Sequence, residues 1–156
     1  MALCNPADLC AGIAPGARLL GLDVGTKTIG LALSDTRRVI ATPLDTIRRK
    51  RLREDLAALF AAVTRHDIGA LVVGLPLRLD GGDGPRTQSV RQFAKNLLAV
   101  RDLPLAFWDE RMSTLAVERG MLAADLTRKR RAEIVDRAAA AYILQGYLDW
   151  LNRAER

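Results

Sequence analysis

An acidic residue in the middle of an apolar run is the feature that most constrains how this chain folds. Asp23 lies within residues 19–25, where all six remaining residues are leucine, valine or glycine. A short continuous apolar run of this kind predicts a strand covered on both faces. A carboxylate there is costly unless its desolvation is offset by donors, a charge or a cation. We therefore expect Asp23 to lie at a polar opening near the end of its strand.

Two further acids occur in similarly apolar settings. Glu110 follows the apolar residues 105–108, and active-site groups of open sheets collect beyond the carboxyl ends of parallel strands. Its neighbour Asp109 is the alternative, because successive strand residues point to opposite faces and only one should face Asp23. We predict that Glu110 is the residue used, with Asp109 supporting it.

The third acid, Asp136, is expected on a helix. Its spacing places it on one helix face with Ala140, Ile143 and Tyr147, a stripe otherwise suited to packing. The small residues 138–141 let such a helix approach a sheet closely and carry Asp136 toward the other acids. The simpler readings are that Asp23 caps a turn and that Asp136 pairs with Arg137 or an arginine of the sheet.

Three carboxylates brought together favour a shared divalent cation. Oxygen ligands suit Mg²⁺ or Mn²⁺, and a pair of such ions about 4 Å apart supports phosphodiester hydrolysis. His66, the single histidine, falls at an expected helix end and is interpreted as structural. The pattern therefore favours a metal-dependent nuclease with Asp23, Glu110 and Asp136 as both the metal ligands and the catalytic residues.

Length and composition indicate one compact domain with a polyanionic partner. The chain has 156 residues and a net charge of +6, which favours nucleic acid through phosphate neutralisation. Residues 1–17 are rich in small residues and breakers and are expected to form a flexible extension, with a single domain over 18–156. Two cysteines and no membrane-spanning run indicate a reduced, cytoplasmic protein without disulfides or membrane contact.

The apolar pattern predicts a mixed α/β fold. Strands are expected near residues 19–24, 29–33, 39–47, 70–74 and 103–108, the first three as an antiparallel meander. Helices are expected near 50–65, 87–100, 113–124 and 130–151. Strands that alternate with helices after a meander describe a mixed sheet with helices on its faces.

Several polar and basic residues are candidates for binding the nucleic-acid backbone. The expected turn after the first strand carries Thr26 and Lys27, whose hydroxyl, amides and charge suit a phosphate. Arg111 directly follows Glu110, and Arg78 and Arg86 delimit a glycine-rich loop. A guanidinium can hold a phosphate through two hydrogen bonds. The dense basic runs at 48–51 and 128–131 can bind the phosphate backbone without base specificity. Alternatively, each run is only the solvated start of a helix.

Four motifs together resemble the YqgF/RuvX family, relatives of Holliday-junction resolvases with an RNase H-like fold. They are residues 22–30 (LDVGTKTIG), 73–77 (VGLPL) with Asp80-Gly81, 109–114 (DERMST), and Asp136 before Ala139-Ala140. The resemblance extends from about residue 18 to 151. Arg78 stands where the family often has asparagine, and Met112 where it usually has leucine.

The resemblance implies a five-stranded sheet in the order 3-2-1-4-5 and catalytic acids at Asp23, Glu110 and Asp136. It also implies a role in maturing the 5′ end of the precursor of 16S rRNA. One alternative is a resolvase of branched DNA, and another is a non-catalytic RNA-binding or transcription-associated factor. A resolvase would act as a symmetric dimer, whereas an RNA-trimming enzyme could act as a monomer. An actin-like or sugar-kinase ATPase needs two such domains around a cleft, which this length does not supply.

Overall fold

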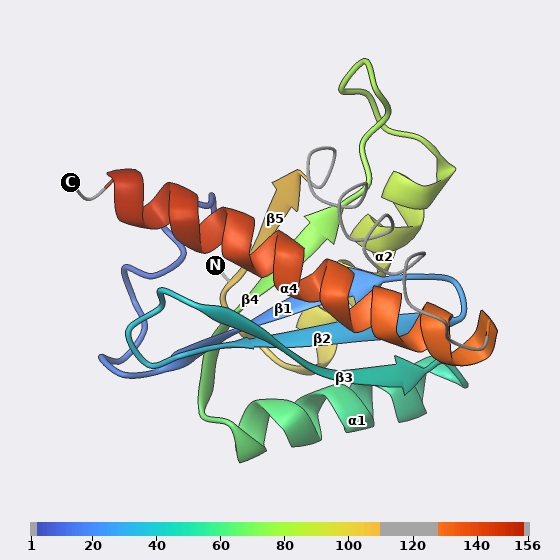
Figure 1. Cartoon of the computed structure of the whole chain (residues 1–156), viewed down its shortest axis with the longest axis horizontal. Helices are drawn as coiled ribbons and strands as arrows, with labels where there is room; N and C mark the ends of the chain where they lie inside the picture. The colour runs from blue at the N-terminus through green and yellow to red at the C-terminus, as the bar shows by residue number, and fades with distance from the viewer. Residues whose placement is uncertain (1–2, 110–127, 155–156) are drawn as a thin grey trace.

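A five-stranded mixed sheet is the centre of the fold in the computed structural model, which describes residues 3–109 and 128–154 (Figure 1). The strands are β1 (Arg18–Val24), β2 (Thr28–Ser34), β3 (Ala41–Arg48), β4 (Ile68–Leu75) and β5 (Leu105–Asp109). They are arranged in the order β3-β2-β1-β4-β5. The β1, β2 and β3 strands pair antiparallel, whereas β4 runs parallel to both β1 and β5. The predicted order is confirmed.

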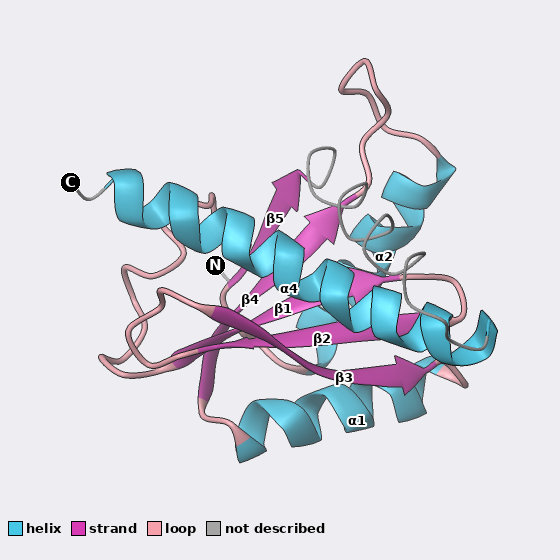
Figure 2. Cartoon of the chain, viewed as in Figure 1, coloured by secondary structure: helices cyan, strands magenta, loops and turns pink. Residues whose placement is uncertain are grey.

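Helices cover both faces of the sheet (Figure 2). They are α1 (Leu52–Arg65), α2 (Pro85–Val100) and α4 (Arg128–Ala154). Each begins and ends within three residues of the prediction. The helix expected over 113–124 lies outside the described residues. None of the helices in the described part of the chain combines the length and apolar character that a membrane crossing needs.

Side-chain alternation divides the apolar residues of the sheet between two cores. On one face, Leu20, Leu22 and Val24 of β1 pack with residues of α1 and α2. On the other face, Leu19 belongs to a core formed mainly by α4, which contributes Ala140, Ile143, Leu144, Tyr147 and Leu148. Because successive residues of a strand point to opposite faces, Gly21 and Asp23 lie on the α4 side. The sheet therefore presents Asp23 to α4.

Two glycines allow α4 to pack very close to the sheet. A Cβ atom at Gly21 would lie 2.8 Å from Leu144 Cβ and 3.0 Å from the carbonyl oxygen of Ala140. At Gly30 it would lie 2.0 Å from the carbonyl oxygen of Asp136. The backbone of α4 thus rests directly on β1 and β2. This contact fixes the height of Asp136 above the sheet.

The N-terminal segment corrects the expectation of a flexible extension outside the fold. Leu9 is 1% exposed and belongs to the α4 core. The amide of Cys4 donates to the Leu105 carbonyl at 2.8 Å, and the Tyr147 hydroxyl donates to the Pro6 carbonyl at 2.8 Å. Cys4, Cys10 and Ile13 of the same segment also pack against this core. The segment's small residues and breakers shape an irregular path along the surface of the core.

Replacing Gly30 by alanine is expected to lower the free energy of unfolding by about 1–3 kcal/mol. The new methyl group meets backbone atoms of Asp136 and Arg137, which can retreat only if α4 shifts. Gly12→Ala is the matched control, because nothing lies within 4 Å of a Cβ atom there. Urea unfolding followed by circular dichroism measures both. Equal stability of the two variants would contradict the close contact.

Candidate active site

Asp23 occupies a gap in the side chains of the sheet. It is the next-to-last residue of β1, and its cross-strand partner on β2 is Gly30. On the other side, the register of β1 with β4 ends at Leu22 and Val73, and the next residue of β4 is Gly74. Glycines therefore occupy the positions beside Asp23 on both neighbouring strands, and Asp23 itself is partly buried. At these two positions of the sheet, β2 and β4 contribute no side chain.

Asp136 approaches this gap from α4. Its backbone rests on Gly30, the cross-strand partner of Asp23. Its carboxylate accepts a short hydrogen bond from the Thr28 hydroxyl of β2. Thr28 and Gly30 lie on the same face of β2 by alternation, so the strand holds both the backbone and the side chain of Asp136. The structure thus brings two of the three predicted acids to one place.

The electrostatics of Asp23 reflect this crowding. Burial, and then the nearby charge of Asp136, raise the pKa of Asp23 to about 6 from an ordinary value of 3.8, while Arg86 acts in the lowering direction. Desolvation and a like charge both disfavour the ionised carboxylate. The chain therefore concentrates negative charge where it is poorly solvated. A strongly perturbed carboxylate in such a place is typical of functional sites.

The third predicted acid, Glu110, lies outside the described residues, as does Arg111. Asp109 ends β5 and lines a cavity of about 650 Å³ on the α4 side, together with Trp108, Tyr142 and Gln145. Within residues 3–109 and 128–154, no three His, Cys, Asp or Glu side chains form a group that could hold a metal ion. The described part of the site is thus the pair Asp23 and Asp136.

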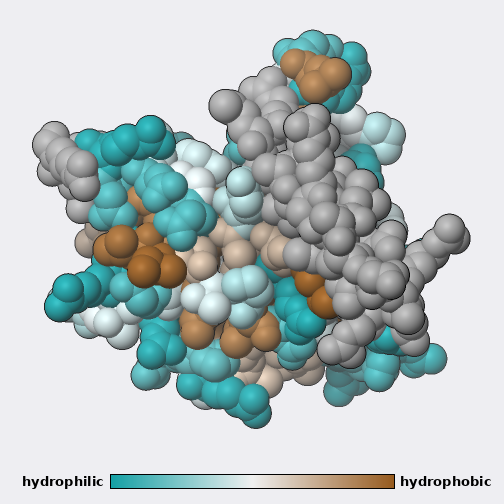
Figure 3. Space-filling model, viewed as in Figure 1, coloured by the Kyte–Doolittle hydropathy of each residue, from teal (hydrophilic) through white to brown (hydrophobic). Residues whose placement is uncertain are grey.

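The predicted phosphate-binding turn follows β1 directly. The Gly25 amide donates to the Thr28 carbonyl at 2.8 Å and closes the turn, leaving the side chains of Thr26 and Lys27 exposed. They lie at the end of the sheet where Asp23 is found. The face of the molecule that carries α4 is shown in Figure 3, where hydrophilic and apolar patches are intermixed over the described surface.

Arg86 and Arg78 differ in their placement. The Arg86 guanidinium reaches from the start of α2 to the carbonyl oxygen of Val24, to which its Nη2 donates at 3.2 Å. It therefore contacts the strand end next to Asp23. Arg78 instead pairs with Asp80 at 2.8 Å on the exposed loop, where both side chains are more than half exposed. The structure places Arg86 at the candidate site and Arg78 at the tip of its loop.

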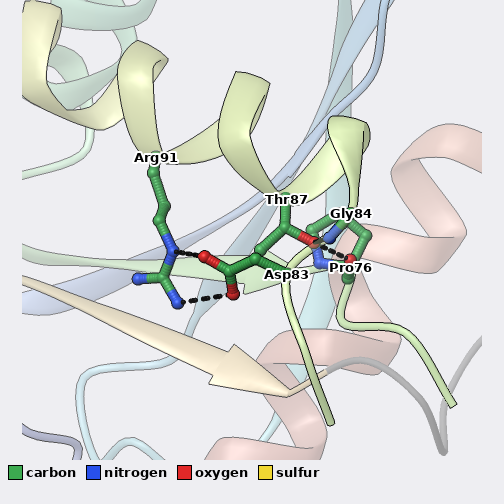
Figure 4. Close-up of polar contacts among 5 residues, drawn as sticks. All are labelled: Pro76, Asp83, Gly84, Thr87 and Arg91. Carbon is green, nitrogen blue, oxygen red and sulfur yellow. Dashed lines mark hydrogen bonds and ion pairs between the residues drawn. The ribbon is translucent and has the colours of Figure 1, made fainter. Parts of the chain in front are cut away.

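The loop between β4 and α2 is tied at both ends (Figure 4). The buried Thr87 hydroxyl donates to the Pro76 carbonyl and accepts a hydrogen bond from the Gly84 amide. Arg91 donates two hydrogen bonds to Asp83, at 3.0 and 3.2 Å. These contacts hold the beginning of α2, and with it Arg86, against the sheet.

Thr28 and Arg49 were not predicted as site residues. Thr28 could have been found from the sequence, because it precedes Gly30 by two positions and so shares its face. Arg49 was expected only as part of a basic run. It donates from Nη1 to the Gly25 carbonyl at 2.8 Å, a contact that depends on long-range folding.

The chain belongs to the RuvX family, described as Holliday junction resolvase, which it matches over residues 17–150. A relative in Paramagnetospirillum magneticum is 59% identical over 149 residues, covering 96% of both chains. One in Rhodospirillum rubrum is 53% identical over 154 residues, covering 98% of this chain and 96% of the relative. Both carry the name "Putative pre-16S rRNA nuclease". The prediction of the family, and with it of a hydrolase of phosphodiester bonds, is confirmed.

Solved structures confirm the RNase H-like fold. The fowlpox virus resolvase in complex with Holliday junction DNA superposes with a TM-score of 0.54 at 10% identity, covering 86% of this chain and 98% of that one. The yeast mitochondrial Holliday junction resolvase gives a TM-score of 0.51 at 11% identity, covering 96% and 85%. At such identities the likeness concerns the arrangement of the sheet and helices alone.

The raised pKa of Asp23 predicts how Asp23→Asn changes stability with pH when chelator is present. Between pH 3.8 and 6 the folded protein holds the Asp23 proton that the unfolded chain has lost. The free energy of unfolding of the wild type therefore falls as the pH rises through this window and stays lower above it. The variant shows no such fall, because asparagine does not titrate. The variant should gain up to about 3 kcal/mol relative to wild type from pH 4 to 7. Urea unfolding at several pH values measures it; a difference independent of pH would contradict it.

Proposed function

We propose that this protein is a metal-dependent nuclease whose catalytic acids are Asp23, Asp136 and Glu110. The observation that supports it most is the meeting of Asp23 and Asp136 at a glycine-lined gap. Folding places two carboxylates together although their repulsion is costly. A cation that binds both offsets that cost.

The residues present fit Mg²⁺ or Mn²⁺. Carboxylates are the ligands these ions prefer, and the described pair offers no competing thiolate or imidazole. Asp23 and Asp136 would hold the ion, with Glu110 as the third ligand expected from the sequence. When bound, such an ion activates water and neutralises charge on the phosphate that is attacked.

The chain's own residues position the acids and the substrate. Thr28 orients the Asp136 carboxylate through its hydroxyl. Arg86 lies beside Asp23, where its charge partly balances the two acids. Thr26 and Lys27 are exposed at the same end of β1 and would contact a backbone phosphate. Arg78 and Arg111 are proposed to bind further phosphates along the nucleic-acid strand.

The proposed substrate is the precursor of 16S rRNA, cut at its 5′ end. The names of close relatives support this choice, and the net charge of +6 suits a polyanion of any sequence. Branched DNA is the second candidate, because the family description is that of a Holliday junction resolvase. Both substrates present phosphodiester bonds to the same acids.

Asp23→Asn and Asp136→Asn should each abolish cleavage while leaving nucleic-acid binding intact. Each variant removes one charge and little volume. Purified protein is incubated with precursor rRNA or four-way DNA, with Mg²⁺ or Mn²⁺ and with or without EDTA. Binding is measured separately by gel shift in EDTA.

The control is Asp102→Asn, which alters an exposed acid just before β5, at the opposite end of the parallel strands from Asp23. It should retain cleavage. Cleavage that persists in Asp23→Asn, or that continues unchanged in EDTA, would contradict the proposal. Cleavage of four-way DNA and not of rRNA would overturn the choice of substrate while keeping the chemistry.

A further inference from the structure

Arg49 belongs to a basic run but turns into the protein. Residues 48–51 read Arg-Arg-Lys-Arg, and Arg48, Lys50 and Arg51 are exposed. The Arg49 side chain is only 22% exposed. Its Nη1 donates to the Gly25 carbonyl at 2.8 Å, and its backbone amide donates to the Lys27 carbonyl at 2.8 Å. One residue of the run thus holds both ends of the turn that follows Asp23.

A buried carboxylate fixes the direction of this guanidinium. Asp55, in the first turn of α1, is 2% exposed. It accepts a hydrogen bond from the Lys50 amide at 2.8 Å and pairs with Arg49 Nε at 3.4 Å. The Arg49 guanidinium also lies over the Phe93 ring of α2, 5.3 Å from its centroid. Elements on the far side of the sheet from α4 therefore hold Arg49 in place.

Two guanidiniums converge on consecutive carbonyls directly after Asp23. Arg86 donates to Val24 and Arg49 donates to Gly25. They come from different parts of the chain, the start of α2 and the segment before α1. A strand end would normally leave these carbonyls to water. Both are instead held by charged donors, whose hydrogen bonds are stronger than neutral ones.

We propose that Arg49, held by Asp55, is a positioning residue that fixes the backbone following Asp23 and so sets the geometry of the active site. This inference rests on the proposed function for its catalytic part. The residues of the basic run then have two roles. Arg49 points into the protein and holds the turn, whereas its exposed neighbours can contact phosphate. Lysine cannot replace it, because one ammonium does not span two partners as the planar guanidinium does.

Hydrogen exchange tests the positioning independently of activity. In Arg49→Lys the turn loses its bond at Gly25, so amides within residues 23–28 should exchange at least about tenfold faster. Arg101→Lys is the matched control, because that guanidinium lies over Phe60, 5.7 Å from the centroid, at the opposite end of α2 from Arg86. Exchange in residues 23–28 that is unchanged in Arg49→Lys, or equally raised in the control, would overturn the proposal.

Kinetics then separate positioning from substrate grip. Arg49→Lys keeps the charge and should lower kcat about tenfold or more with little change in KM, because a small displacement of a catalytic group slows the reaction. Asp55→Asn should lower kcat in the same way, although it touches no substrate. A rise in KM with unchanged kcat would overturn the proposal in favour of phosphate binding by Arg49. If the wild type cleaves nothing, the proposed function fails, and the exchange result still decides the role of Arg49 in the fold.

Discussion

The contact between α4 and Gly30 is the constraint on which the candidate site depends. Any side chain at residue 30 would collide with the backbone of Asp136. Because Gly30 is the cross-strand partner of Asp23, the same contact sets the separation of the two acids. The packing of a helix on a sheet and the assembly of a charged site are thus one event. The apolar stripe of α4, buried over Ala140, Ile143 and Tyr147, supplies the favourable energy.

That packing brings together two groups that repel. Asp23 is partly buried and lies in the field of Asp136, so its ionised form is disfavoured. The surrounding contacts reduce the penalty without removing it: Thr28 donates to Asp136, and Arg86 lies close enough to lower the pKa of Asp23. Under the proposed function, a cation that binds both acids would offset the remaining penalty. Stability has been given up locally where binding chemistry is expected, as is common for functional sites.

Much of this arrangement could be predicted from the sequence, because it follows from local patterns. The apolar runs gave the strands, and the spacing of Asp136 gave its helix face. Family motifs supplied the strand order. The glycines opposite Asp23 were not foreseen, since cross-strand partners depend on register. The packing of Leu9 was missed because its segment shows no periodicity. The inward turn of Arg49 depends on Asp55, Gly25 and Phe93, three separate parts of the chain.

The most direct test of the account is a Mn²⁺ titration, followed by electron paramagnetic resonance, of the wild type, Asp23→Asn, Asp136→Asn and the double variant. If the two acids hold one cation, each single change should weaken binding at least about tenfold. The double variant should then be little weaker than either single one, because residues that share a ligand are not additive. Losses that simply multiply, or affinity unchanged in the single variants, would contradict a shared site.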